Sequence, residues 1–392
     1  MLRKNIILFK LQSLFNGLWL FAALAIIYFE TITKSYAIAM LVFAVVNISQ
    51  SISEVPCGMY SDRMDRKKTL VIGSICVLIN MILWALAGTF NSVFLLFVGS
   101  VMRGVGLAFK SGTDNAMIYE TLQQIRERKL FMIVLSKINS FYQLGALIAA
   151  FVSSVFIFYF SLNTLVWLAV LPYIGVVAVN CMMVNPKNNF PKDMNVKQQI
   201  VKSIKTFIKN KKLRKYALLN IFNISLLNSV FRFESTYYEQ LIPLHLINIV
   251  RALQHCSGWI SYHLVQLFSG TNVLKLLSYS TLGSAVVRLF GLIINNAVSP
   301  FIMSAQNLFY GTTETSSATI LQREYSGGLR ATLESIIGLF GGIGIGLIGF
   351  LMGVAADIFS PRTVLFICVF LSMIISLSYR RLFRPSKQNK KA

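Results

Sequence analysis

Residues Gly58–Lys68 read GMYSDRMDRKK, a short charged segment between two long apolar segments at about residues 36–57 and 69–87. A helix crosses a bilayer in about 20 residues, so each apolar segment is long enough to do so. The charged segment is therefore expected to form a tight turn at the membrane surface. Within it, Asp62 and Arg66 are four residues apart, which places them on one face wherever the stretch is helical.

The composition restricts the class of protein. The chain has 392 residues, of which 55% are hydrophobic and 13% charged, and the apolar residues fall in long runs. An integral membrane protein fits this composition and a soluble one does not. The formal net charge is +23, but the basic residues lie in short loops between apolar runs, which indicates membrane orientation and no nucleic-acid partner. The five cysteines lack CxxC spacing, and no metal site is implied.

Twelve apolar runs predict an all-α membrane protein with twelve transmembrane helices. The runs lie at residues 11–30, 37–57, 69–88, 93–119, 130–158, 164–184, 216–238, 246–268, 273–293, 298–321, 331–354 and 362–380. Lys and Arg concentrate in the loops on one side, and the N-terminal MLRKNIILFK is basic. Both termini are therefore expected in the cytoplasm, with the chain in the inner (plasma) membrane of a bacterial cell.

A long polar stretch divides the chain. We predict an N-terminal six-helix bundle at residues 1–184, a basic cytoplasmic linker at 185–215, and a C-terminal six-helix bundle with a basic tail at 216–392. Apolar residues recur at helical spacing among the lysines of the linker. This pattern fits either an amphipathic helix on the anionic inner leaflet or a plain solvated linker.

The two predicted bundles contain related sequences. Ser111-Gly-Thr-Asp114 lies near the end of the fourth span, and Gly311-Thr-Thr-Glu314 lies at the corresponding place in the tenth. Such an echo is expected of two structural repeats around a central pathway.

Charged residues inside the predicted spans cost about 2.5–3.5 kcal/mol each, so their presence needs a reason. Arg103, Lys110 and Asp114 are spaced by seven and four residues, which places them within about 40° of one another on a helix. We expect this stripe to line a watery cavity. Asp114 then either stays ionised beside Lys110, carries a proton, or forms a buried pair with Lys110 that only fixes helix packing.

Other polar residues recur on single faces of the fifth, seventh, eighth and tenth spans, and these faces are expected to meet at one cavity. Our candidates for proton or ion coupling are Asp114, Glu314 and His255. Our candidates for the substrate pathway are Arg103, Lys110, Lys137, Gln143, Arg232, Arg251 and Asn307. No catalytic residues are proposed.

The charged turn resembles the signature of the major facilitator superfamily of transporters. In that signature a glycine is followed after three residues by Asp, Arg or Lys, any residue, Gly, Arg, and Arg or Lys, in the loop between the second and third helices. Gly58, Asp62, Arg63, Arg66 and Lys67 match it, whereas Asp65 occupies the position of the second glycine. The resemblance implies two pseudo-symmetric six-helix bundles that alternate in access to the two sides of the membrane.

The stretch RGVGLAFKSGTDNAMIYE, residues 103–120, resembles the fourth helix of bacterial exporters of this superfamily. The family's usual arginine falls at Ser100, and Arg103 lies one turn further on. Glu120 matches the position from which the family's fourth helix supplies an acid to the charged turn. The resemblance therefore implies a network of Asp62, Arg66 and Glu120, which we call the inner latch, that closes the cytoplasmic side.

The sequence predicts a secondary transporter without a bound cofactor, driven by a gradient of protons or another cation. Proton-coupled efflux of amphipathic, drug-like compounds or of a metabolite, by antiport, is favoured by the exporter-like helices. The alternative is proton-coupled uptake of an organic anion or metabolite, because several intramembrane arginines can bind a carboxylate or phosphate. A membrane receptor or enzyme is the remote alternative. The protein is expected to act as a monomer on a small-molecule substrate.

Overall fold

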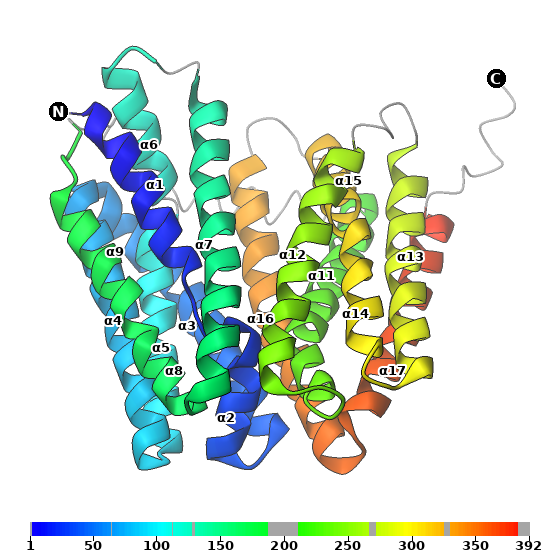
Figure 1. Cartoon of the computed structure of the whole chain (residues 1–392). Helices are drawn as coiled ribbons and strands as arrows, with labels where there is room; N and C mark the ends of the chain where they lie inside the picture. The colour runs from blue at the N-terminus through cyan, green and yellow to red at the C-terminus, as the bar shows by residue number, and fades with distance from the viewer. Residues whose placement is uncertain are drawn as a thin grey trace, which may run out of the picture. The chain divides into compact units, whose positions relative to one another are not determined.

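The computed structural model describes residues 2–63, 65–111, 113–127, 130–186, 211–265, 272–324 and 330–382. Within these ranges the chain forms helices joined by short loops, and no β-strand (Figure 1). Each of the predicted apolar runs coincides with one helix or with a series of shorter helices in the same direction.

In the first half of the chain, the helices are α1 (Arg3–Gly17), η1 (Ala22–Leu24), α2 (Ala25–Thr33), α3 (Tyr36–Arg63), α4 (Arg66–Phe90), α5 (Val93–Lys110), α6 (Thr113–Gln124), α7 (Phe131–Tyr159), α8 (Leu162–Leu168) and α9 (Val170–Met182). In the second half they are α11 (Lys211–Tyr238), α12 (Leu244–Leu264), α13 (Val273–Ile294), α14 (Ser299–Ser304), η4 (Ala305–Phe309), α15 (Tyr310–Glu324), α16 (Arg330–Ile358) and α17 (Pro361–Leu382).

Nine segments of the described residues are long and apolar enough to cross a membrane by length and composition alone. The remaining predicted spans correspond to α11, α12 and the run α14–η4–α15. The first two reach the length needed, but polar side chains lower their hydropathy, for example Asn223, Arg232 and Glu234 in α11. A spanning helix tolerates such residues where they face the inside of a bundle and not lipid.

Several predicted spans are broken rather than continuous. The first is interrupted between α1 and η1, the fourth between α5 and α6, and the tenth by the short 3-10 helix η4. At the fourth, Ser111 ends α5 with an extended ψ of 121°. Irregular backbone at membrane depth is tolerated where it is buried in protein or lines a cavity. The breaks therefore indicate where polar sites lie.

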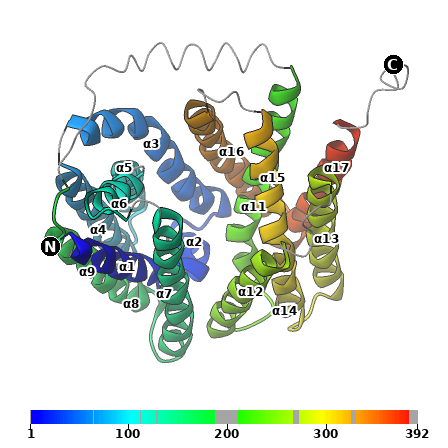
Figure 2. The same cartoon turned by 90° about the horizontal axis from the view of Figure 1, so that it is seen from above.

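By packing, the chain divides into two compact units. Unit 1 comprises Met1–Asp193, Pro243–Ala252 and Gly349–Asp357, and unit 2 comprises Met194–Ile242, Leu253–Ile348 and Ile358–Ala392. In unit 1, α4 packs along α5 and α9, and α1 packs along α7 (Figure 2). In unit 2, α13 packs along α15 and α17, and α11 packs along α17.

Most of the predicted linker, residues 187–210, lies outside the described residues, as does the basic tail at 383–392. The predicted boundaries at 184 and 215 and the amphipathic helix therefore stay predictions.

Helix ends repeat between the two halves of the chain. Asn91 ends α4 and Asn295 ends α13, each with left-handed backbone and an N–H bonded to the helix's own carbonyl four residues back. Ser161 caps the start of α8 through the N–H of Thr164, and Ser360 bonds the N–H of Thr363 in α17 in the same way, at 3.2 Å each. These matching ends support the structural repeat.

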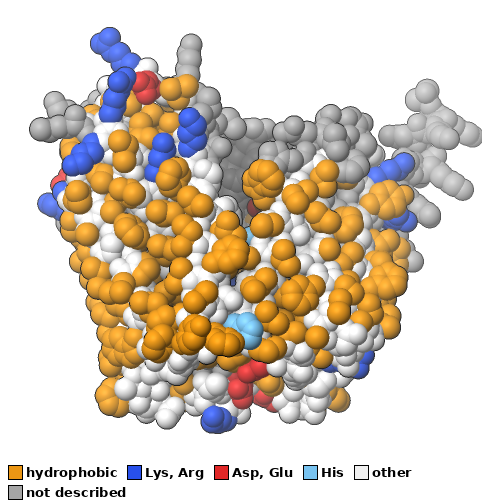
Figure 3. All heavy atoms as spheres, viewed as in Figure 1, with side chains coloured by type: hydrophobic (Ala, Val, Ile, Leu, Met, Phe, Trp, Pro, Cys, Tyr) orange, Lys and Arg blue, Asp and Glu red, His pale blue; other side chains and the backbone are white. Residues whose placement is uncertain are grey.

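The outer surface suits a lipid environment. Large apolar side chains such as Phe94, Phe158 and Phe370 are more than half exposed, at 73%, 65% and 56%. Figure 3 shows hydrophobic side chains over most of the visible face, with Lys and Arg gathered near the N-terminal end. Apolar side chains facing outward between charged ends are what a bilayer requires.

Two glycines bring α1 and α7 into close contact. A Cβ atom added to Gly145 would lie 2.2 Å from the carbonyl oxygen of Leu14, and one added to Gly17 would lie 2.2 Å from that of Tyr142. Neither position admits a side chain unless the two helices separate. Small residues at such crossings are a general device of membrane helix packing.

We expect Gly145→Leu to lower the midpoint of thermal unfolding in detergent, because overpacking a helix contact costs about 1–3 kcal/mol. Gly338→Ala is the matched control, since a Cβ there meets no atom within 4 Å. Equal midpoints for the two variants would contradict the close contact between α1 and α7.

Candidate functional site

Unit 1 contains a polar cavity of about 290 Å³. The predicted stripe of Arg103, Lys110 and Asp114 lies in its wall, although the helix is broken between the second and third of these residues. The other polar residues of the wall come from α1, α6, α7 and α9, and they are Gln12, Ser13, Asn16, Asn115, Asn139, Tyr142 and Tyr173. Trp19 lines the cavity from the loop that follows α1.

Arg103 is held between two indole rings. Its guanidinium carbon lies 4.2 Å from the ring centroid of Trp19 and 5.4 Å from that of Trp84. Nη1 donates a hydrogen bond to Oδ1 of Asn80 at 3.3 Å. No carboxylate of the described residues lies within ion-pairing distance of this guanidinium. Cation–π contacts thus hold the charge in place and leave it available to an anion.

A glycine and two hydrogen bonds explain the position of Trp84. Gly99 on α5 faces it, and a Cβ there would lie 2.8 Å from the ring. The indole Nε1 donates to the carbonyl of Leu96 at 3.1 Å, and the hydroxyl of Tyr28 donates to the carbonyl of Trp84 at 2.6 Å. The ring of Trp84 is therefore held by α5, and the backbone that carries it is held by Tyr28 of α2.

Two hydrogen-bond donors beside Arg103 are unsatisfied. Nε1 of Trp19 and Nδ2 of Asn80 are buried and find no acceptor among the described residues. An unsatisfied buried donor costs about 1–3 kcal/mol, so each such group calls for an explanation, and a bound ligand or water is one. Together with the guanidinium they form a donor cluster, which we define as Arg103, Trp19 and Asn80.

Lys110 and Asp114 bond to α1 and not to each other. Nζ of Lys110 donates to Oδ1 of Asn16 at 3.1 Å, and Nε2 of Gln12 donates to Oδ1 of Asp114 at 3.4 Å. No ion pair joins the two charged residues in this part of the chain. Of the alternatives that the sequence left open, direct pairing for helix packing has no support in this geometry.

The contact predicted at the charged turn is present between Arg66 and Glu120. Nε of Arg66 lies 3.3 Å from Oε1 of Glu120, and the two side chains are 5% and 14% exposed. The pair joins the start of α4 to α6. Its role in the inner latch stays a prediction.

The other residues of the turn are only partly described. Gly58, Asp62 and Arg63 belong to α3, but their side chains lie outside the described residues. Lys67 is half-buried, and its backbone N–H donates to Oδ1 of Asn185 at 3.2 Å. The participation of Asp62 in the latch therefore also stays a prediction.

In unit 2 the predicted coupling residues are on the surface. Glu314 on α15 is exposed and accepts a hydrogen bond from the hydroxyl of Tyr262 on α12. His255 is exposed with its ring 6.3 Å from that of Phe231. Asn307 is half-buried and donates to the carbonyl of Gln254 at 3.0 Å.

The remaining pathway candidates have different surroundings. Lys137 and Gln143 are exposed on α7 and are not in the wall of the cavity. Arg232 is half-buried on α11, and Arg251 is 5% exposed on α12. Within unit 1 the structure thus brings Arg103, Lys110 and Asp114 together in the wall of one cavity, and Lys137 and Gln143 are not in that wall.

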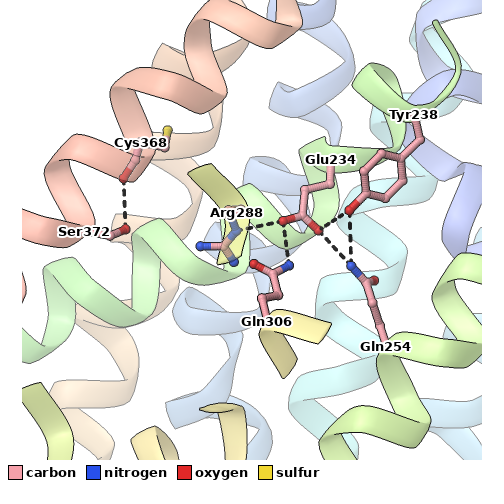
Figure 4. A network of polar contacts seen from close by, with 7 residues as sticks. All are labelled: Glu234, Tyr238, Gln254, Arg288, Gln306, Cys368 and Ser372. Carbon is pink, nitrogen blue, oxygen red and sulfur yellow. Dashed lines mark hydrogen bonds and ion pairs between the residues drawn. The ribbon is translucent and has the colours of Figure 1, made fainter. Parts of the chain in front are cut away.

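The sequence analysis missed a buried polar network in unit 2, centred on Glu234 of α11 (Figure 4). Its carboxylate is fully buried and pairs with Nε of Arg288 at 2.9 Å. From the sequence, the charged residue of this helix named as a site candidate was Arg232. One acid and one base, each inside a different predicted span, are the signal that could have suggested this pair.

Glu120→Gln is expected to lower the free energy of unfolding by about 1.5–3 kcal/mol, the worth of a hydrogen bond to a charged group. Glu127→Gln is the matched control. Its partner Arg3 lies 2.6 Å away but is 76% exposed, and an exposed pair contributes at most about 1 kcal/mol. Chemical denaturation in detergent measures the free energy of unfolding of both variants. Equal decreases would contradict a larger stabilising contribution from the buried pair of Arg66 and Glu120.

Comparisons with known proteins identify the fold. The model of the Major Facilitator Superfamily matches residues 11–294. No curated protein sequence matches the chain significantly. Among solved structures, a variant of the nucleoside transporter NupG is similar at 14% identity with a TM-score of 0.83, covering 97% of this chain and 100% of that chain.

Two other solved structures have the same fold. The fucose:proton symporter FucP of E. coli has 16% identity and a TM-score of 0.60, with 97% of this chain and 99% of that chain covered. A D-xylose-proton symporter has 13% identity and a TM-score of 0.72, with 97% and 98% covered. The expected all-α architecture of two six-helix bundles is confirmed. Since the family model covers most of the chain, the protein belongs to the Major Facilitator Superfamily, and it is a multi-pass membrane transporter of small molecules rather than an enzyme.

Proposed function

We propose that this transporter takes up a small organic anion and that a proton gradient drives the uptake. The observation that carries the proposal is the donor cluster of Arg103, Trp19 and Asn80, in which the cation has no carboxylate partner and two donors have no acceptor among the described residues. The likeness to two transporters named as proton symporters supports the proton as coupling ion.

The charges of the cavity favour an anionic group. Arg103 and Lys110 contribute two positive charges to its wall, and Asp114 contributes one negative charge. A carboxylate or phosphate accepts two parallel hydrogen bonds from a guanidinium, a geometry that also selects its orientation. Because the two indole rings already fix the guanidinium, binding of the anion costs little additional side-chain entropy.

Efflux of an amphipathic compound by proton antiport is the second candidate. It is supported by the aromatic side chains in the wall of the same cavity, which are Phe9, Trp19, Tyr142 and Tyr173. These rings suit a flat apolar body, whereas the donor cluster suits an acidic group. The two candidates thus differ in the charge of the substrate and in the direction of its movement.

The protein's environment follows from the same proposal. We expect it to act as a monomer in the plasma membrane, with both termini in the cytoplasm and the basic loops against the anionic inner leaflet. Accessibility of single cysteines placed at residue 2 and in the loop after Phe90 would test this orientation.

To test the substrate class, the purified protein is reconstituted in liposomes with an alkaline interior, and labelled solutes are added outside. The panel contains benzoate, lactate and glycerol 3-phosphate as anions, uridine and xylose as neutral solutes, and ethidium as a cation. We expect accumulation of at least one anion and of none of the others. Accumulation of a neutral solute alone would contradict the proposal, and extrusion of ethidium under the reversed gradient would favour the second candidate.

Arg103→Gln is expected to reduce uptake of the anion at low concentration by at least about tenfold. A charge-assisted hydrogen bond is worth about 1.5–3 kcal/mol, and about 1.4 kcal/mol corresponds to a factor of ten. Arg380→Gln is the matched control, since Arg380 also stacks on an aromatic ring, 4.5 Å from the centroid of Tyr279, but does not line the cavity. Similar losses in both variants would remove Arg103 from the binding site.

A further inference from the structure

Glu234 of α11 is the centre of a buried network inside unit 2. Its side chain is fully buried, and four side chains donate to its two carboxylate oxygens. Nε of Arg288 at 2.9 Å and Nε2 of Gln306 at 2.7 Å bond to Oε1. Nε2 of Gln254 at 3.0 Å and the hydroxyl of Tyr238 at 3.2 Å bond to Oε2. Figure 4 shows the four donors converging on the carboxylate.

Packing alone does not account for this network. Replacing a buried ion pair by apolar residues of similar size is often neutral or stabilising, so burial of Glu234 and Arg288 is not a route to stability. In a spanning helix an ionisable side chain is also costly to insert. Groups of this kind are retained where a proton or an ion is handled.

The side-chain amide of Gln306 makes a hydrogen bond through its nitrogen but not through its oxygen, among the described residues. Nε2 donates to Oε1 of Glu234, whereas the amide Oε1 of Gln306 is buried and accepts no hydrogen bond from any described residue. An amide presents a donor and an acceptor at nearly the same place when it turns over. Gln306 can therefore serve a carboxylate with its NH₂ group, and a protonated acid with its oxygen.

We propose that Glu234 is the binding site of the coupling proton and that the amide of Gln306 turns over to hold that proton. The proposal deepens the proton-driven transport proposed above and rests on it. The helix that carries Gln306 supports the motion, because η4 is a short 3-10 segment between α14 and α15 and not a continuous α-helix. Local departures from α-helical geometry often mark such functional positions.

A proton from water binds Oε1 of Glu234 and forms an O–H bond, which converts the carboxylate to a carboxylic acid. The hydrogen bond from Nε2 of Gln306 breaks, the amide turns over, and its Oε1 accepts from the new O–H group. Release of the proton to the other side reverses each change. Arg288 keeps its charge throughout, so the loaded network holds one additional positive charge.

Infrared difference spectroscopy of the purified full-length protein tests the proposal without any transported solute. The pH is stepped between roughly 5 and 8, since carboxyl groups at functional sites can titrate above their ordinary range. We expect a reversible C=O band of a protonated carboxylic acid at low pH. The band is expected to be lost in Glu234→Gln and kept in Glu314→Gln and in Ser372→Ala.

Ser372 is a suitable control because its hydroxyl donates to the carbonyl of Cys368 within α17 and not to Glu234. If Glu234→Gln unfolds because Arg288 loses its partner, the double variant Glu234→Gln with Arg288→Gln replaces it, and the same loss of the band is expected. Gln306→Leu is expected to keep the band and to shift its frequency, since the acid then lacks its acceptor.

A band that persists in both Glu234 variants, or its absence from the wild type over the whole range, would overturn the proton site. An unshifted band in Gln306→Leu would overturn the role of the amide. Because the spectrum requires no substrate, failure here is separate from failure of the liposome assay. Anion uptake with no Glu234 band leaves the proposed function standing and removes this site.

Discussion

The cost of placing charge inside a membrane governs the polar interior of this protein. Each charged side chain at membrane depth costs about 2.5–3.5 kcal/mol unless other groups satisfy it. The chain meets this constraint in three ways. Arg66, which is buried in the charged turn expected at the membrane surface, has an acid, Glu120, at 3.3 Å. Arg103 has two aromatic rings and an amide in place of an acid. Glu234 has a base and three neutral donors.

The surroundings of Glu234 and of Arg103 differ in the hydrogen-bonding groups that remain for a ligand. The Glu234 carboxylate has donors on both oxygens, so in this state a solute has little to add to it. The donor cluster at Arg103 is incomplete, because Trp19, which lines the cavity, and Asn80, which lies behind Arg103, each keep a donor without an acceptor among the described residues. A carboxylate whose two oxygens already accept hydrogen bonds has room for a proton but not for a larger ligand. Donors without acceptors, in contrast, suit a ligand that brings acceptor atoms. On this basis we assign substrate binding to unit 1 and proton binding to unit 2 in the proposals above.

The breaks in the helices are part of the same arrangement. A continuous helix satisfies all of its backbone groups, and polar side chains on it point along one stripe. The break after Lys110 lets α6 start again at Thr113 while Asp114 still lines the cavity of α5. The 3-10 helix η4 carries Gln306, which donates to Glu234 of α11, and Asn307, which donates to the carbonyl of Gln254 in α12. Both breaks fall at polar sites, where neighbouring side chains replace the lost regular structure.

The amino-acid sequence by itself determined the class of protein, the positions of the spans, and the residues of the charged turn. Hydropathy and helical spacing are properties of consecutive residues, so Arg103, Lys110 and Asp114 could be placed on one stripe in advance. The pair of Arg66 and Glu120 was available only through resemblance to a family. The partners of Arg103, the network of Glu234, and the separation of Lys137 from the cavity were decided by the tertiary structure. Each depends on which helices become neighbours, because side chains far apart in the chain satisfy a buried charge only after the helices have packed.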